Sequence, residues 1–255
     1  MSFEPPRIIS AATPGVNTAS EALQTVCLRY NRQVSQTDMQ MLELGLKVLV
    51  SYLAGSVNGA LLLGKLLGLE DVRRTGSGNA GATNALRAHG RTFAATVMLV
   101  DVLKGALPVL LLPELPLPGV AADPLVAREW LAYGCAGAAV FGHCYPLWHG
   151  FAGGKGFATA IGALGTLDPM LLLPLALAWP AGLLVSGYVG VATVLAAFAV
   201  PLCVAVVLPT LDLNALVFTS ALAGFIAFTH RSNLRAFAAG TTPPDIGFSL
   251  LKRAR

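Results

Sequence analysis

Apolar residues dominate the chain from Leu42 onward, in stretches of about 18–25 residues, enough to cross roughly 30 Å of hydrocarbon. Strand-like alternation is absent, and backbone groups in lipid must be hydrogen-bonded within their own segment, so the stretches predict helices. Asp168-Pro169 separates two overlapping stretches, because proline ends helices and aspartate favours turns. We therefore expect an all-α integral membrane protein, a bundle of about seven transmembrane helices at 43–68, 92–112, 126–148, 156–173, 171–187, 190–209 and 213–230.

Residues 1–40 have a different pattern, with prolines, Gly15 and many small polar residues, and no apolar run of spanning length. Such a composition is typical of segments that do not bury a core. We expect 1–40 to be a poorly ordered N-terminal extension. The seven-helix domain, with a tail on the cytosolic side, would then occupy 41–255.

Composition agrees with a lipid environment. The chain is 55% hydrophobic and 12% charged, whereas soluble domains carry roughly 25% charged residues. The net charge of +4 is not gathered into a basic stripe with interleaved aromatics, so nucleic acid is not an expected partner. The four cysteines form no CxxC pair, so neither a disulfide framework nor a metal site is predicted, and no cofactor is expected.

Charged residues in the loops predict the orientation. Basic residues mark the cytosolic side of a membrane protein, which, with seven crossings, puts the N-terminus outside and the C-terminus inside. The basic loops contain Arg73, Arg74, Arg87, Arg91, Lys155 and a C-terminal tail with five further Lys or Arg residues, and the opposite loops contain Glu114, Asp123, Arg128, Glu129, Asp168 and Asp212.

The first of three polar segments, all on the predicted cytosolic side, is Gly-Ser-Gly-Asn-Ala-Gly-Ala-Thr-Asn at 76–84, followed by Arg87. Small residues let backbone N–H groups approach an anion, and arginine presents a planar fork that suits phosphate. The GxxxxGK[ST] spacing of a Walker loop is missing. The segment is either an anion-binding loop or a flexible connection between helices.

The second polar segment runs from Gly142 to Thr159 and contains Gly153-Gly154-Lys155-Gly156 at the start of a predicted helix. Backbone donors, the positive helix end and a lysine together favour an anion. The alternative is a tight turn whose lysine only marks the cytosolic side. Tyr145 and Trp148 are expected to be interfacial anchors, and His149 a solvated loop residue.

In the third polar segment, His230 and Asn233 are three residues apart and so share a helix face. They suit phosphate binding or proton transfer, unless the segment is only a polar helix end in water. Asp101 and Lys104 have the same spacing inside a predicted span, where isolated charges are costly. They form either a structural ion pair or a contact with a ligand.

Taken together, the three segments are more informative than each alone. All three return to one membrane face, which a phosphate-bearing ligand at the cytosolic boundary explains. Two other classes remain open: a transporter or channel for a phosphorylated metabolite, and a structural membrane subunit. The transporter is disfavoured because no internal repeat or mid-membrane site is evident.

Three signature blocks give the chain a resemblance to a known family. GSGNAGATN at 76–84, GHCYPLWHGFAGGKGFAT at 142–159 and HRSNLRAFAAG at 230–240 resemble the bacterial acyl-phosphate:glycerol-3-phosphate acyltransferases, the PlsY family. SYLAGSVNGALL at 51–62 and DVLKG at 101–105 are also similar. The resemblance covers about 42–245.

The resemblance implies an inner-membrane enzyme that acylates glycerol 3-phosphate from acyl-phosphate, giving 1-acyl-glycerol 3-phosphate and inorganic phosphate. It implies membrane lipid as surroundings and a functional link to an enzyme that produces acyl-phosphate. The candidate catalytic residues are then Ser77, Arg87, Lys155, His230 and Asn233. The candidate substrate- or phosphate-binding residues are Gly76, Gly78, Asn79, Gly81, Thr83, Asn84, Lys104, His143, Gly153, Gly154 and Gly156.

Two positions depart from the family pattern. Thr242 replaces a glutamate that follows the third block, which puts the anchoring of the tail in question. Tyr188 is followed by Val189 and Gly190 where the family tends to carry serine, with Thr193 next, so a phosphate contact there is lost or moved.

Overall fold

The computed structural model describes residues 18–120, 127–206 and 213–245, and this part of the chain is helical and contains no β-strand. The connections include the short 3-10 turns η1 (Val72–Arg74), η2 (Leu147–His149) and η3 (Pro169–Leu171). The α-helices are α1 (Thr18–Gly55), α2 (Gly59–Leu66), α3 (Ala82–His89), α4 (Arg91–Leu111), α5 (Arg128–Cys144), α6 (Phe157–Leu167), α7 (Leu172–Ser186), α8 (Val189–Val206), α9 (Leu213–Thr229) and α10 (Arg231–Ala238).

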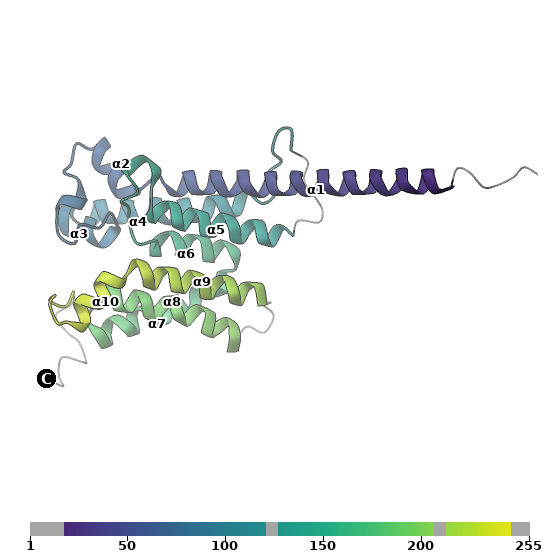
Figure 1. The fold of residues 1–255 in the computed structure, drawn as a ribbon. Helices are drawn as coiled ribbons and strands as arrows, with labels where there is room; N and C mark the ends of the chain where they lie inside the picture. Colours follow the sequence, from purple (N-terminus) through teal and green to yellow (C-terminus); the bar gives the residue numbers. More distant parts are fainter. Residues whose placement is uncertain (1–17, 121–126, 207–212, 246–255) are drawn as a thin grey trace, which may run out of the picture.

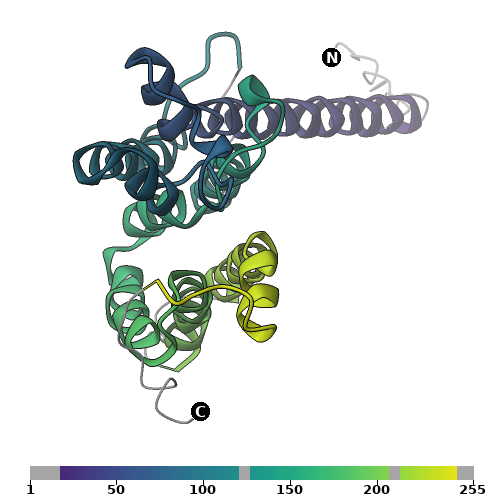
Figure 2. The same ribbon diagram turned by 90° about the vertical axis from the view of Figure 1, so that its left-hand side faces the viewer.

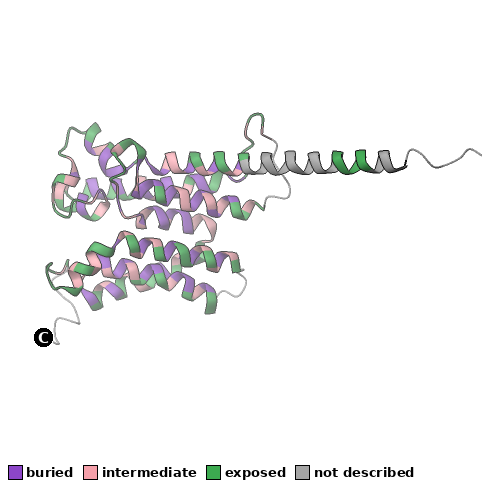
Figure 3. Ribbon diagram, in the orientation of Figure 1, coloured by how far each residue is buried: buried purple, intermediate pink, exposed green. Residues whose placement is uncertain are grey.

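Helix α1 begins much earlier than expected. Residues 18–40, expected to be part of a poorly ordered extension, form its first half, and residues 1–17 lie outside the described part of the chain. Residues 16–44 contain neither glycine nor proline, so nothing in the sequence interrupts a helix that continues into the apolar run. Figure 1 shows this half projecting beyond the bundle, and residues 23–28 are exposed (Figure 3).

Each of the seven predicted apolar stretches coincides with a helix, but seven membrane crossings are not confirmed. Among the described residues, Arg91–Leu111, Pro169–Ser186 and Val189–Val206 are long and apolar enough to cross, and up to five spans result if two bent helix pairs each count as one. The predicted span 43–68 is broken after Gly55 and bends by 50°. Helix α6 has only 11 residues, about 16 Å of rise.

Glycines set the closest helix contacts. A Cβ on Gly105 of α4 would collide with the carbonyl of Thr159, and one on Gly162 of α6 with the carbonyl of Val102. Gly55 and Gly142 play the same part between α1 and α5. The missing side chains let the backbones approach, as in membrane helix pairs with small interface residues. These two crossings hold α4 close to α6 and α1 close to α5.

The helices form two groups, which Figure 2 shows one above the other. Helices α1 to α6 make the first group, and α7 to α10 make the second, in which α8 packs on both α7 and α9. A common apolar core joins the groups, with Val140 and Leu164 on one side and Leu175, Ala196 and Ile226 on the other. The core leaves room for a cavity nearer the end where α3 and α10 lie.

Candidate active site

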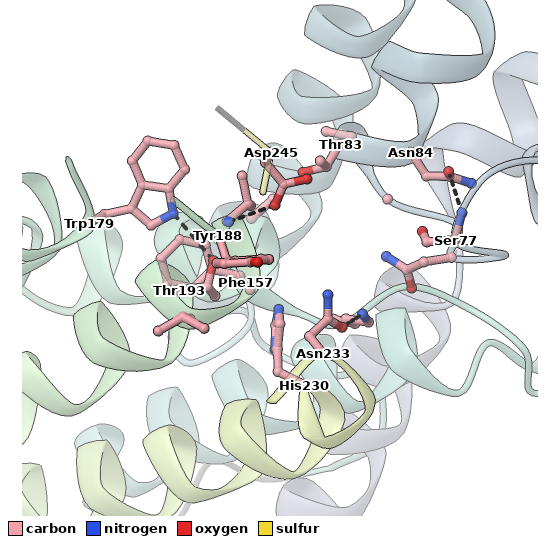
Figure 4. A pocket seen from close by; sticks show the side chains of 18 of the residues that line it. Ser77, Thr83, Asn84, Phe157, Trp179, Tyr188, Thr193, His230, Asn233 and Asp245 are labelled. Atoms are coloured by element: carbon pink, nitrogen blue, oxygen red, sulfur yellow. Dashed lines mark hydrogen bonds between the residues drawn. The ribbon is translucent and has the colours of Figure 1, made fainter. Parts of the chain in front are cut away.

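A cavity of about 1070 Å³ lies between the two helix groups. Figure 4 shows polar side chains from distant parts of the chain around its open space, with Ser77 on one side, Tyr188 on another, and His230 and Asn233 rising from the helices below. Residues of all three polar segments line it. The structure therefore brings them together at a single site.

The first segment is held in shape by Asn84, whose side chain is buried. Its Nδ2 donates to the carbonyls of Val72 at 2.6 Å and Thr75 at 3.0 Å, and its Oδ1 accepts from the N–H of Ser77 at 3.0 Å. Gly76 has φ +56° and packs closely against this amide, so a Cβ at Gly76 would collide with Oδ1 of Asn84. Asn84 therefore organises the loop that presents Ser77 and Thr83 to the cavity.

The second segment is packed against its own preceding helix. The N–H of Gly154 donates to the carbonyl of His143 at 3.1 Å, and that of Gly153 to the carbonyl of Cys144 at 3.2 Å. A Cβ on Gly154 would overlap the His143 ring, so glycine is required for this approach. The turn delivers Lys155 to the cavity wall next to the N-terminus of α6.

Lys155 joins the second segment to the third. Its ammonium donates to Oδ1 of Asn233, and its carbonyl accepts from the Thr229 hydroxyl at 2.9 Å. Burial, and to a lesser degree the charge of Arg87, lowers the pKa of Lys155 below the usual lysine value, and Asp245 acts in the opposite direction. Lys155 is thus a desolvated cation whose charge is available to an anionic ligand.

His230 is buried at the junction of α9 and α10. Its Nδ1 lies 2.8 Å from the carbonyl oxygen of Ile226, an acceptor, so Nδ1 carries the hydrogen and the neutral ring keeps its lone pair on Nε2. His230 lines the cavity. The ring can accept a proton or a hydrogen bond there.

Beneath the cavity, Asp101 and Lys104 form a buried ion pair with Oδ1 and Nζ 2.9 Å apart. Lys104 also donates to the carbonyl of Val57 at 2.9 Å, and the N–H of Gly59 donates to Asp101 at 3.2 Å. Asp101 reaches the cavity wall, whereas Lys104 is not among the residues that line it. Of the two alternatives for this pair, the structure contains the ion pair.

Some of the candidate site residues line the cavity, and others do not. The lining includes Ser77, Asn79, Gly81, Thr83, Asn84, Arg87, His143, Lys155, Gly156, His230 and Asn233, and it does not include Gly76, Gly78, Lys104, Gly153 or Gly154. Two of the glycines outside it, Gly76 and Gly154, shape the loops through the contacts described above. Arg73, in the η1 turn that precedes the first segment, donates through its guanidinium to the carbonyls of His149 at 3.1 Å and Ala152 at 3.2 Å. It therefore ties η1 to the second segment.

Part of the cavity lining was not predicted from the sequence. Its apolar wall contains Met98, Phe157, Ile161, Leu172, Leu175, Trp179, Pro180 and Val191, and further polar lining comes from Tyr188, Ser232 and Asp245. The apolar residues were concealed within ordinary spans. An acidic residue in a tail that is otherwise basic was the available signal for Asp245.

The structure shows what the residues at the two departures from the family pattern, Thr242 and Gly190, contact. Thr242 lines the cavity, and its main-chain carbonyl accepts from the Tyr188 hydroxyl at 3.1 Å. A Cβ on Gly190 would press on the Asn233 side chain, so glycine there makes room for this residue. The Thr193 hydroxyl accepts from Nε1 of Trp179 at 3.3 Å.

The arrangement suits a ligand with an anionic head and an apolar tail. Arg87 and Lys155 supply positive charge, neutral donors surround them, and the apolar wall continues from the same space. The described residues contain no group of three His, Cys, Asp or Glu side chains placed to hold a metal ion.

Comparison with known proteins gives a consistent result. Residues 46–240 match the model of the glycerol-3-phosphate acyltransferase family. The glycerol-3-phosphate acyltransferase of Azotobacter vinelandii is 42% identical over 198 residues, 76% of this chain and 96% of that protein. That of Agrobacterium fabrum is 37% identical over 198 residues, 78% of this chain and 90% of that protein.

Solved structures are similar as well. The crystal structure of PlsY (YgiH), an integral membrane glycerol 3-phosphate acyltransferase, in its glycerol 3-phosphate form has a TM-score of 0.68 and 30% identity, covering 83% of this chain and 98% of that one. Its lysophosphatidic acid form has a TM-score of 0.67 at 30% identity. With the apolar helices and the cavity described above, these similarities show that the chain is a membrane acyltransferase and belongs to the glycerol-3-phosphate acyltransferase family.

Proposed function

We propose that this protein transfers a fatty acyl group from acyl-phosphate to the 1-hydroxyl of glycerol 3-phosphate. The products are 1-acyl-glycerol 3-phosphate (lysophosphatidic acid) and inorganic phosphate. The observation that carries the proposal is the dual character of the cavity, with Arg87 and Lys155 near neutral donors and an apolar wall formed by α6, α7 and α8. Both substrates carry a phosphate, and the donor also carries a fatty chain.

The chemistry needs no covalent intermediate. The 1-hydroxyl oxygen attacks the acyl carbonyl carbon, a C–O ester bond forms, and the C–O bond to phosphate breaks. The leaving phosphate gains negative charge, and prearranged cations and N–H donors stabilise this charge in a site from which water is partly excluded. We assign this role to Lys155 and Arg87, with Ser77, Asn79 and Thr83 as neutral donors.

The hydroxyl proton has two possible acceptors in this scheme: Nε2 of His230 and a phosphate oxygen of a substrate. The hydrogen bond of Nδ1 to Ile226 supports the first, because it leaves Nε2 unprotonated. The substitution His230→Gln keeps a polar side chain and removes the basic nitrogen. A large fall in kcat would assign the proton to His230, and a retained kcat would assign it to phosphate.

The proposed location is a bacterial inner membrane. The mouth of the cavity, where the exposed lining residues Arg87 and Asp245 lie, would be at the cytosolic face. The basic loops support this orientation, since Arg87 and Lys155 line the cavity and Arg73 contacts the loop that leads to Lys155. A water-soluble acceptor would reach the site from the cytosol, and the fatty chain from the bilayer. An enzyme that makes acyl-phosphate must supply the donor.

The test uses full-length protein purified in detergent, where transport cannot occur. Acyl-phosphate and glycerol 3-phosphate are added together, and lysophosphatidic acid and inorganic phosphate are quantified over time. The proposal predicts equal amounts of the two products. Phosphate release without lysophosphatidic acid, or no reaction by the folded protein, would refute it.

A further inference from the structure

Asp245 connects three parts of the cavity mouth. Its carboxylate pairs with the guanidinium of Arg87, and its other oxygen accepts from the N–H of Val189 at 2.8 Å. Its own N–H donates to the carbonyl of Gly187 at 2.8 Å. The carboxylate is therefore fixed on the turn between α7 and α8 and faces Arg87 on α3, in the other helix group.

Arg87 needs such a partner. It lies near the end of α3, a helix of eight residues, and 46% of its side chain is exposed. A free arginine at this position samples many rotamers, and fixing such a long side chain has an entropic cost. The pairing meets part of this cost before a ligand binds.

The pairing leaves the guanidinium able to bind an anion. Arginine has five N–H donors in a planar fork, and in the described part of the chain only Nη2 of Arg87 is hydrogen-bonded. The other donors remain for a phosphate in the cavity, which Arg87 lines. Asp245 lines the same cavity, but a carboxylate has no donor for a phosphate, so any help that it gives to phosphate binding comes through a neighbouring group, and Arg87 is the cation that it contacts directly.

We infer that Asp245 is a positioning residue for phosphate binding, which holds the Arg87 guanidinium across the mouth of the cavity between the two helix groups. The inference rests on the proposed function. Asp245 lies beyond the residues matched by the family model, which end at 240.

The test compares Asp245→Asn, Arg87→Lys and the double variant in full-length protein. Asparagine can still accept from Val189 but loses the charge that holds Arg87. The matched control is Glu70→Gln, which removes one charge from an exposed residue beside α3. KM and kcat are measured for each substrate separately, and folding is checked by thermal unfolding in detergent.

We expect Asp245→Asn to raise the KM of one substrate by roughly two- to fivefold, the range for a partly exposed ion pair, with a smaller change in kcat. The affected substrate should be the one whose KM rises in Arg87→Lys. In the double variant, Asp245→Asn should add less than in the wild-type background. Glu70→Gln should leave both constants unchanged.

Three results would overturn the inference. A lower KM in Asp245→Asn would mean that the carboxylate competes with phosphate for Arg87. Equal effects of Asp245→Asn in the wild-type and Arg87→Lys backgrounds would mean that it only anchors the tail. An effect on the KM of the other substrate would exclude action through Arg87. Inactive wild-type protein would instead refute the proposed function.

If Asp245→Asn does not fold, Val189→Pro gives a second route. Proline at the first position of a helix is well tolerated and has no N–H, so the substitution removes the backbone anchor of the carboxylate. The same KM should rise. An unchanged KM in this folded variant would contradict the inference.

Discussion

At the scale of single residues, Lys155 is the side chain on which the proposed chemistry depends most. It is partly buried, lies beside the N-terminus of α6 and contacts Asn233 from the third polar segment. A cation in this position acts on the charge that develops on the leaving phosphate. Its neighbours Gly154 and Gly156 pack tightly against His143 and Val140, which fixes the turn that carries Lys155.

We therefore expect Lys155→Ala to lower kcat by about 100-fold or more, the usual loss for one prearranged electrostatic contact. The matched control is Lys65→Ala, an exposed lysine at the end of α2. Both variants should elute as folded protein in detergent. Near wild-type turnover in Lys155→Ala would exclude the assigned role.

Lys155 also predicts a pH dependence. Burial, with the charge of Arg87, lowers its pKa, so its ammonium loses the proton at a lower pH than that of an exposed lysine. The protonated form binds the anion, so activity is present below this pKa and falls as pH rises through it. Lys155→Arg keeps its charge and should move the alkaline limb of kcat/KM upward. An unmoved limb, after correction for spontaneous donor hydrolysis, would argue against Lys155 as the titrating group.

At the scale of helices, long uninterrupted apolar runs were easy to locate from sequence. The predicted 92–112 corresponds to α4 at Arg91–Leu111, and 190–209 to α8 at Val189–Val206. The break in 43–68 was missed because apolar residues flank it on both sides. Asn58 marks it, since its side chain accepts from the N–H of Leu61 and so caps α2.

Part of the site was predictable because some of its residues stand in short polar segments of the sequence. Glycine, lysine and asparagine close together in a polar segment indicate an anion-binding loop. This pattern made Ser77, Lys155 and Asn233 candidate site residues. The Arg87–Asp245 pair joins residues 158 apart in sequence, and only the fold brings them together. The apolar wall was hidden because residues that face a cavity and residues that face lipid have the same composition.

The glycine contact between α4 and α6 gives a prediction about helix packing. Gly162→Leu would force a large side chain into the carbonyl of Val102 and separate the two helices. We expect a loss of folded protein in detergent, seen as aggregation or a clearly lower Tm. The control is Ala95→Leu, on an exposed face of α4. Equal stability of the two variants would show that this close crossing is dispensable.

At the scale of the whole molecule, two helix groups line a cavity of about 1070 Å³, in which the proposed function places both substrates. This favours direct transfer over an acyl-enzyme, because acyl-phosphate is already activated and a protein nucleophile would gain little. Cys144 is buried and does not line the cavity.

Direct transfer predicts that enzyme mixed with radiolabelled acyl-phosphate, without glycerol 3-phosphate, retains no label after denaturation. The same preparation should form labelled lysophosphatidic acid when the acceptor is present from the start. Label that survives on denatured protein and passes to acceptor added before quenching would establish an acyl-enzyme instead.

The identity of the acyl donor tests the central claim most directly. Purified full-length protein is given glycerol 3-phosphate with equal concentrations of acyl-phosphate and acyl-CoA, whose acyl chains carry different isotopes. Mass spectrometry then reads the isotope in lysophosphatidic acid. The proposed function predicts that the product carries only the acyl-phosphate isotope, with one inorganic phosphate released for each molecule formed. Product that carries the acyl-CoA isotope would contradict it.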